Sequence, residues 1–174
     1  PTVILPNGVG IDEPIGRQVT AGQLLYLGRL SWKKNLMPLL DAVADIPGAT
    51  LVLAGPDDEG LADVLRQRAE LAGCSDRVRI VGTVGPDRKR ELFATSACAV
   101  LPSLNENFGN VVIEALAHGC PVVVSPGVGA RTIVEECGGG LIAAGGDAAS
   151  LRNSIAQLLG DPVAAEARGA VGAE

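Results

Sequence analysis

Short apolar runs alternate with longer segments of helical periodicity along this chain, and this repeat limits the possible folds more than any other feature. The apolar runs lack the polar alternation of a half-exposed strand, so we expect strands that are buried on both faces. The predicted strands are Leu24–Leu27, Thr50–Ala54, Val78–Val81, Ala99–Leu101, Val122–Val124 and Gly140–Ile142. The predicted helices are Leu36–Asp45, Glu59–Ala72, Asp87–Thr95, Asn110–His118, Ala130–Glu136 and Ala148–Leu159.

This order of elements predicts an α/β fold built from about six βα units. Because crossovers between parallel strands are right-handed, the units should form a doubly wound, Rossmann-like parallel sheet with helices on both faces. Ligands of such sheets bind beyond the carboxyl ends of the strands. We therefore expect the functional residues in the loops that follow the strands.

The length of 174 residues fits one domain of ordinary size. We expect residues 1–22 to lead in from a preceding domain and residues 23–160 to form the ligand-binding unit. Residues 161–174 are expected to be a tail, because Ala164–Glu174 consists mostly of Ala, Gly and charged residues. The chain begins at Pro1 rather than Met, and we expect it to be a fragment of a longer protein.

Composition argues against several classes of function. The chain carries 14 basic and 20 acidic residues, a formal net charge of −6, so we expect no broad surface for nucleic acid or anionic lipid. One Trp, one Tyr and two Phe residues are too few for an aromatic base-stacking platform. Apolar stretches such as Ala97–Leu101 are far shorter than the ~20 residues that span a bilayer. The sequence predicts a cytoplasmic protein, with any contact at the inner face of the membrane made by a part outside this chain.

The four cysteines form no Cys-x-x-Cys pair and have no neighbouring His. They are Cys74, Cys98, Cys120 and Cys137. We expect reduced thiols that are mostly buried, and no zinc site.

Two common nucleotide-binding motifs are absent from the sequence. Neither Gly-x-Gly-x-x-Gly after the first strand nor Gly-x4-Gly-Lys-Ser/Thr occurs, which argues against dinucleotide dehydrogenases and P-loop nucleotidases. The glycines of Gly127-Val128-Gly129 and Gly138-Gly139-Gly140 are predicted to serve turns and helix caps. The acidic pair Asp57-Asp58 is the nearest candidate for a metal site, but we predict that it caps the following helix.

Three cations lie beside the carboxyl end of the first predicted strand. Arg29 follows this strand directly, and Lys33 and Lys34 precede the next helix. The forked guanidinium of Arg contacts two phosphate oxygens while Lys acts as a movable point charge, so the combination suits a diphosphate. Taken alone, these residues could equally form a solvated charge cluster on a turn.

Two carboxylates lie where the fourth predicted strand joins its helix. Glu106 and Glu114 are separated by seven residues. If the helix begins near Gly109, Glu114 lies roughly 8–10 Å farther along, at a rise of about 1.5 Å per residue. The free N–H groups of the first helical turn lie between the carboxylates and can bind a phosphate. A nucleotide sugar matches this layout, with its sugar at one carboxylate, its pyrophosphate at the helix start and its ribose at the other.

Each carboxylate also has a purely structural explanation. Glu106 could be an N-terminal helix charge, and Glu114 could be a solvated helix residue. The segment 110–116 is otherwise nearly all apolar, so a buried helix with one unpaired Glu would be costly. This weakens the structural explanation of Glu114.

The ordered motifs of the chain resemble the C-terminal, donor-binding domain of retaining GT-B glycosyltransferases of family 4, group 1, and the likeness covers nearly the whole chain. The matching segments are Pro6-Asn7-Gly8-Val9, Leu27-Gly28-Arg29-Leu30 with Lys34, Leu53-Ala54-Gly55, Val78-Arg79-Ile80-Val81-Gly82, Glu106 to Glu114 as Glu-x7-Glu, and Glu114-Ala115-Leu116-Ala117-His118-Gly119-Cys120-Pro121-Val122.

The resemblance implies a hexosyltransferase that uses a UDP- or GDP-sugar as donor and retains the anomeric configuration. It implies that Arg29 and Lys34 hold the pyrophosphate and stabilise the leaving group, with Lys33 as a bystander. It further implies that Glu106 contacts the sugar and that Glu114 receives the ribose hydroxyls. The backbone at Phe108, Gly109, Asn110 and Val111 would contact sugar and phosphate. The resemblance implies no metal or cofactor. It implies that an N-terminal domain of the same enzyme binds the acceptor. Because this fragment lacks that domain, we expect it to be inactive alone.

The chain departs from the family pattern in two places. Asn107 stands where many members have Gly in a Glu-Gly-Phe-Gly motif, a change that is compatible with function and could tune the choice of sugar. After the fifth strand, Gly127-Val128-Gly129-Ala130-Arg131 replaces a Gly-Gly pair followed by an acidic residue. The family's contacts from that loop are therefore not carried over.

Three alternatives remain open from the sequence. Nucleotide-sugar epimerases share the GT-B architecture, but their acid–base residues would lie outside this chain, because its single histidine, His118, is predicted to end a helix. A sugar phosphorylase would need a pyridoxal-phosphate lysine, for which there is no strong candidate. A non-enzymatic signalling module of receiver type would need acidic residues where Gly28-Arg29 and Gly82 stand.

Overall fold

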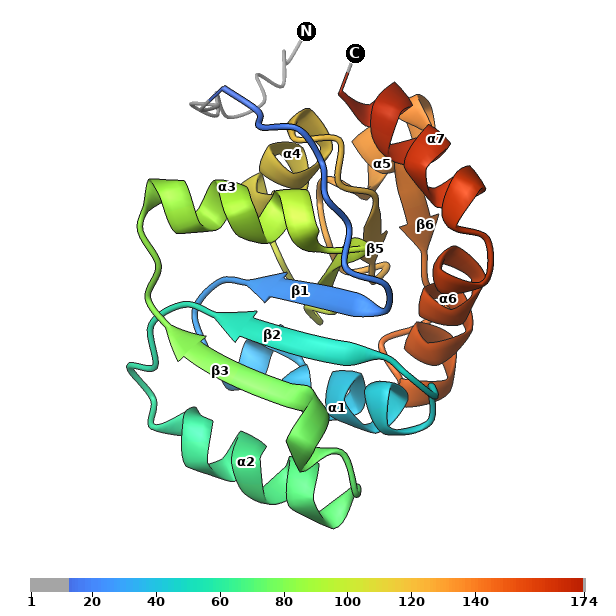
Figure 1. Cartoon of the computed structure of the whole chain (residues 1–174). Coiled ribbons are helices and arrows are strands. Elements are labelled where there is room, and N and C mark those ends of the chain that lie inside the picture. The colour runs from blue at the N-terminus through green and yellow to red at the C-terminus, as the bar shows by residue number, and fades with distance from the viewer. Residues whose placement is uncertain (1–12, 174) are drawn as a thin grey trace, which may run out of the picture.

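A parallel sheet of six strands forms the centre of the molecule, with the strand order β3-β2-β1-β4-β5-β6 (Figure 1). The computed structural model describes residues 13–173, so the motif at Pro6-Asn7-Gly8-Val9 lies outside the described residues. The strands are β1 (Gln23–Leu27), β2 (Thr50–Ala54), β3 (Val78–Gly82), β4 (Cys98–Leu101), β5 (Val122–Val124) and β6 (Gly140–Ile142). The predicted doubly wound α/β sheet is confirmed.

Helices cover both faces of this sheet. They are α1 (Leu36–Ala44), α2 (Leu61–Leu71), α3 (Pro86–Thr95), α4 (Asn110–Ala117), α5 (Arg131–Cys137), α6 (Ala148–Gly160) and α7 (Pro162–Gly172), with short 3-10 turns η1 (Trp32–Lys34) and η2 (Ser75–Arg77). Helix α1 packs on α2 and α6, whereas α7 packs on α4 and α5. Figure 1 shows α1 and α2 on one side of the sheet and α3 and α4 on the other.

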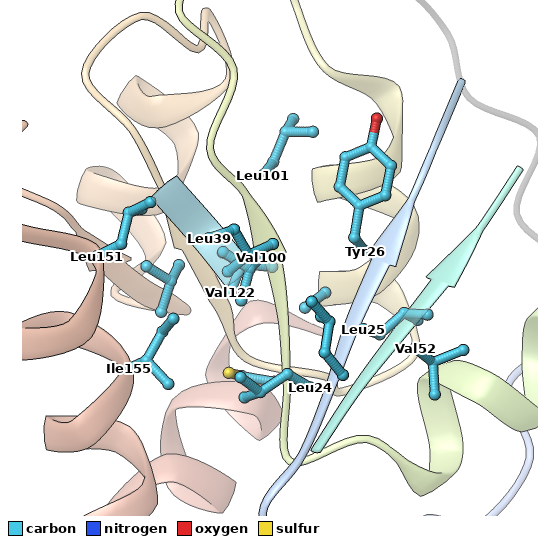
Figure 2. Packing of buried hydrophobic residues seen from close by; sticks show 14 of the residues in the cluster. Leu24, Leu25, Tyr26, Leu39, Val52, Val100, Leu101, Val122, Leu151 and Ile155 are labelled. Carbon is cyan, nitrogen blue, oxygen red and sulfur yellow. The ribbon is translucent and has the colours of Figure 1, made fainter. Parts of the chain in front are cut away.

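The core lies on both faces of the central strands. Leu24 and Leu25 are neighbours on β1 whose side chains point to opposite faces, and both are 0% exposed. Figure 2 shows them packed with residues of other strands and with Leu39 of α1 and Ile155 of α6. Full burial of such a side chain contributes about 1.5–3 kcal/mol, so this layer fixes the sheet that carries the loops.

Strand β3 is not buried on both faces, and that part of the sequence prediction is wrong. Its residues alternate between half-buried and exposed, and Val81 is 40% exposed. The reason is that β3 pairs only with β2 and forms one edge of the sheet. The β6 strand at the other edge is also only partly buried.

The segment 161–174, expected to be a tail, contains helix α7. Asp161 caps this helix by accepting a hydrogen bond from the backbone N–H of Ala164 at 3.0 Å, and Pro162 occupies its first turn. The buried residues of α7 are Ala165 and Gly169, which lie one turn apart. Small residues let the helix approach the rest of the domain closely, and they are why no apolar periodicity marks the helix in the sequence.

The prediction that the cysteines are mostly buried is confirmed. Cys74, Cys98 and Cys120 are buried, Cys137 is half-buried, and all four are free thiols. Burial raises the pKa of the Cys98 and Cys120 thiols, so both stay protonated near neutral pH. Residues 13–173 hold no group of three His, Cys, Asp or Glu side chains arranged to bind a metal ion. In the same range, no helix has the length and apolarity needed to cross a bilayer.

Candidate functional site

A cleft of about 330 Å³ lies at the carboxyl edge of the sheet, between the loops that follow β1 and β4. These strands are neighbours although the chain winds outward from them in opposite directions, so the cleft occupies the topological switch point at which ligands of such sheets bind. Its lining consists of Leu27, Gly28, Lys34, Leu101, Glu106, Asn107, Phe108, Gly109, Asn110 and Val111.

A second groove, of about 230 Å³, lies at the amino edge of the sheet. Its lining is mostly apolar and includes Ala21, Ala97, Leu158 and Ala165. The cleft at the carboxyl edge lies at the topological switch point and brings Lys34 and Glu106 together beside the start of α4, so we place the candidate site there.

Most of the site residues predicted from the sequence converge on this cleft. Lys34, Glu106 and the residues 108–111 line it. Arg29 and Glu114 do not line it. Arg29 has an exposed side chain in the loop that follows β1, and Glu114 lies on α4, more than one turn from the helix start.

Lys34 and Glu106 form an ion pair inside the cleft. Their side chains are 23% and 22% exposed, so most of each is removed from water. Lys34 ends the 3-10 turn η1, and Glu106 lies in the loop between β4 and α4. The cation and the carboxylate that the sequence analysis assigned to different parts of one ligand therefore neutralise each other in the free protein.

Glu114 has a partner that the sequence analysis did not identify. Lys89 of α3 places Nζ at 3.0 Å from Oε2 of Glu114, and the two side chains are 24% and 19% exposed. The argument that a structural role would leave this carboxylate unpaired therefore does not hold. Because Lys89 and Glu114 belong to different βα units, no local spacing rule could pair them.

Arg29 stands at the exposed rim of the site. Its Nε lies 3.6 Å from Oδ2 of Asp58, and both side chains are 63% exposed, so this contact is weak and readily exchanged. The predicted capping role is confirmed for Asp57 alone, whose carboxylate accepts hydrogen bonds from Leu61 N at 2.6 Å and Ala62 N at 3.0 Å. For Asp58 that prediction is wrong.

The amino end of α4 opens onto the cleft, as the sequence predicts. Gly109 is the N-cap residue and has a φ of 93°, a backbone conformation that favours glycine. A Cβ at this position would lie 3.0 Å from Leu101 and 3.1 Å from Val128 side-chain atoms. Since Gly109 offers no side chain to cap the helix, the first-turn N–H groups and the positive end of the helix dipole face the cleft.

The loop after β5 supports the Glu106 loop through backbone contacts. Glu106 N donates to Gly127 O, and Gly129 N donates to Glu106 O, both at 2.9 Å. A Cβ on Gly127 would lie 2.0 Å from Leu104 O, and one on Gly129 would lie 2.1 Å from Asn107 O. The predicted turn role of these glycines is confirmed, and Arg131 folds back to donate to Pro126 O at 2.7 Å.

Asn35 ties together three loops at the carboxyl edge, a role that the sequence analysis missed. Its Nδ2 donates to Pro102 O at 3.1 Å and to Gly146 O at 2.7 Å. Among residues 13–173, Asn35 is the one non-glycine residue with a positive φ, which is 57°. It follows Lys34 directly. The clamp thus fixes the backbone that carries Lys34.

Tyr26 holds the backbone of Arg29 through a hydrogen bond. Its hydroxyl donates to Arg29 O at 2.7 Å and points toward the carboxyl end of β1 (Figure 2). Burial raises the pKa of Tyr26, and the charge of Glu106 raises it further. The hydroxyl therefore remains a hydrogen-bond donor well into the alkaline range.

His118 is the C-cap residue of α4, as predicted, with Gly119 following at a φ of 67°. Its Nδ1 lies 2.8 Å from the backbone O of Glu114, and its ring lies 5.2 Å from the ring of Phe93 on α3. His118 is buried, and we therefore give it a structural role at the end of α4.

Comparison with known proteins agrees with this geometry. The model of the family described as glycosyl transferases group 1 matches residues 11–173. D-inositol 3-phosphate glycosyltransferase 2 of Catenulispora acidiphila is 34% identical over 161 residues, which cover 86% of this chain and 38% of that protein. The chain thus spans well under half the length of this curated relative.

Two solved structures share the fold. Alr3699/HepE of Anabaena, determined in complex with UDP and glucose, superposes with a TM-score of 0.80 at 28% identity, over 87% of this chain and 42% of that one. The C-terminal domain of LpcC, a group 1 family protein of Francisella tularensis, superposes with a TM-score of 0.76 at 18% identity, over 86% and 81% of the two chains. The chain belongs to the glycosyl transferases group 1 family.

Proposed function

We propose that this chain is the donor-binding domain of a hexosyltransferase that uses a UDP- or GDP-sugar and retains the anomeric configuration. The observation that carries the proposal is the convergence of Lys34, Glu106 and the amino end of α4 on one cleft at the switch point of the sheet. The complex of HepE with UDP and glucose supports a nucleotide sugar as the ligand class. No observation on the described residues favours an epimerase, a phosphorylase or a signalling module.

The diphosphate binds between Lys34, Arg29 and the first turn of α4. Cleavage of the sugar–phosphate bond builds negative charge on the departing diphosphate, and groups that stabilise this charge accelerate the reaction. Lys34 supplies a point charge, Arg29 a forked donor from the exposed rim, and α4 its free N–H groups. We propose that these groups meet the charge without a metal or an organic cofactor.

The sugar binds beside Glu106 and the backbone at 108–111. Donor binding then exchanges partners: the phosphate takes Lys34 from Glu106, and the sugar hydroxyls donate to the released carboxylate. Glu106 is the carboxylate in the lining of the cleft, so it is placed to stabilise the positive charge that develops on the anomeric carbon. Asn107 and Phe108 line this part of the cleft and contribute to the choice of sugar.

The nucleoside extends along α4, where Glu114 accepts hydrogen bonds from the ribose hydroxyls. The acceptor binds to an N-terminal domain of a longer enzyme. The 38% share that the chain covers of its glycosyltransferase relative supports the existence of a further part. We propose a cytoplasmic enzyme that contacts the membrane only through that other domain.

Calorimetric titration of the chain with UDP and GDP tests this function. We expect binding by the wild type and its loss in Arg29→Ala, whereas Arg66→Ala, which removes an exposed cation from α2, should bind as the wild type does. Equal binding by Arg29→Ala would remove Arg29 from the site. Equal affinities for UDP and 2′-deoxy-UDP, or for the guanosine pair, would exclude recognition of the ribose by Glu114.

Two further measurements address turnover. The chain alone should show no transferase turnover, and measurable turnover would contradict its role as a donor-binding part. In the full-length enzyme, NMR coupling constants of the first-formed glycoside should show the anomeric configuration of the donor, and the opposite configuration would exclude retention.

A further inference from the structure

We propose that Lys89 is a positioning residue that holds the Glu114 carboxylate in place for the ribose and thereby sets the selectivity of the site for ribonucleotides. This inference rests on the proposed function, in which Glu114 receives the ribose hydroxyls.

The contact uses only one of the two carboxylate oxygens. Lys89 Nζ lies 3.0 Å from Oε2 of Glu114. Within residues 13–173, no protein group donates a hydrogen bond to the other oxygen, Oε1. A carboxylate has lone pairs for about four hydrogen bonds, so Oε1 is available to a ligand while Oε2 stays anchored.

The surroundings of Glu114 make an anchor necessary. The α4 residues three positions away on the same face, Val111 and Ala117, are apolar, and neither can hold a carboxylate. A hydrogen bond to a ligand hydroxyl is directional, so an unanchored carboxylate would lose rotamer entropy on binding and discriminate poorly. The Lys89 ammonium removes this freedom before the ligand arrives.

Both partners of the contact stand on regular helices, and a second contact keeps these helices in register. Lys89 and Phe93 lie four residues apart on α3, and Glu114 and His118 lie four residues apart on α4. The ion pair Lys89–Glu114 and the ring contact Phe93–His118 at 5.2 Å are therefore stacked one helical turn apart. The contribution of the ring contact to helix packing can therefore be tested apart from the effect of Lys89 on Glu114, because Phe93 can be changed while the ion pair stays intact.

The test is the ratio of affinities for a ribonucleoside diphosphate and its 2′-deoxy analogue, measured by calorimetry with UDP or GDP, whichever binds tighter. We expect a ratio of about tenfold or more in the wild type, because a site built to bind a hydroxyl rejects the analogue that lacks it. In Lys89→Met the ratio should fall below about threefold through weaker binding of the ribonucleotide. Lys89→Arg should retain most of the ratio.

Two matched variants separate this role from a structural one. Arg88→Met removes an exposed cation from the same helix and should leave the ratio unchanged. Phe93→Leu should lower the melting temperature and also leave the ratio unchanged, because it loosens the α3–α4 packing without touching the ion pair. A ratio in Lys89→Met within twofold of the wild type, or an equal fall in Phe93→Leu, would overturn the positioning role of Lys89 while nucleotide binding stands. Absence of any nucleotide binding by the wild type would instead overturn the proposed function, and this inference with it.

Discussion

The two glutamates of the Glu-x7-Glu segment are each paired with a lysine, but the pairs stand on different kinds of backbone. Lys34 and Glu106 are 23% and 22% exposed, and Lys89 and Glu114 are 24% and 19% exposed, so solvation does not distinguish the pairs. The first pair joins a 3-10 turn to a loop, whereas the second joins the middle of α3 to the middle of α4.

This difference in backbone predicts different roles for the two pairs. A pair on two loops opens when a ligand offers replacement partners, because its backbone can shift and a phosphate replaces the carboxylate. A pair on two helices keeps its geometry, because the hydrogen bonds within each helix hold the two backbones in place. We therefore propose that Lys34 and Glu106 exchange partners with the diphosphate and the sugar, and that Lys89 and Glu114 recognise the nucleoside with fixed geometry.

Among changes to the two lysine–glutamate pairs, removing the cation of the loop pair should have the largest effect on ligand binding. Lys34→Met should weaken nucleoside diphosphate binding by about 10- to 150-fold, the range expected for loss of one charge-assisted hydrogen bond. Lys33→Met, which removes the exposed neighbouring cation, is the matched control and should bind like the wild type. Equal losses in both variants would show that only the general positive charge of the turn matters.

Removing the charge of the Glu106 carboxylate should affect the binding of the nucleotide sugar differently from the binding of the nucleoside diphosphate. Glu106→Gln frees Lys34, so the affinity for the nucleoside diphosphate should be unchanged or higher. The affinity for the nucleotide sugar should fall by about tenfold, because hydroxyl donors lose a charged acceptor. Competition titrations of the two ligands measure both changes, and parallel losses for both ligands would contradict the exchange of partners.

The clamp beneath the loop pair should contribute chiefly to stability. Asn35→Gly keeps the left-handed backbone and removes two hydrogen bonds, which should lower the free energy of unfolding by about 1–3 kcal/mol. Asn35→Ala should cost about 1–2 kcal/mol more, because a Cβ disfavours a φ of 57°. Urea unfolding of the wild type and the two variants measures the contribution of the hydrogen bonds and that of the backbone conformation. Equal stability of Asn35→Gly and Asn35→Ala would contradict the backbone contribution.

The smallest expected effect concerns Tyr26 and depends on pH. Its pKa is raised by burial, so the folded state keeps the phenol protonated above the unfolded value of about 10. The unfolded state then binds fewer protons, and stability should fall as the pH rises above about 10. Tyr26→Phe should flatten this fall and cost about 0.5–1.5 kcal/mol at neutral pH through the lost bond to Arg29 O.

Tyr26 is the single tyrosine of the chain, so tyrosinate absorbance reports it directly. Ionisation of the native protein near the ordinary tyrosine pKa would contradict the burial argument.

Features set by neighbouring residues in the chain could be predicted from the sequence. The six strands lie within one residue of their predicted bounds, and α4 begins after Gly109 as expected, because apolar runs and a glycine cap are local signals. The same holds for the cluster of Lys34 and Glu106, which follows from parallel strands whose carboxyl ends share one edge of the sheet.

Features set by contacts between distant units could not be predicted. The exposure of β3 depends on its place at the sheet edge, which is a property of strand order. Helix α7 is stabilised by close packing of small residues that leave no apolar pattern. The partners of Asn35 and Glu114 come from other βα units, so the clamp and the helix pair emerge only in the folded chain.

Amide chemical shifts during titration with UDP or GDP test the central claim most directly, namely that a nucleotide diphosphate binds at the carboxyl edge between Lys34 and the start of α4. We predict the largest ¹H–¹⁵N shift changes at Gly109, Asn110 and Val111, and their disappearance in Lys34→Met. Changes confined to the apolar groove near Ala97, or the same changes at 109–111 in Lys34→Met and the wild type, would contradict it.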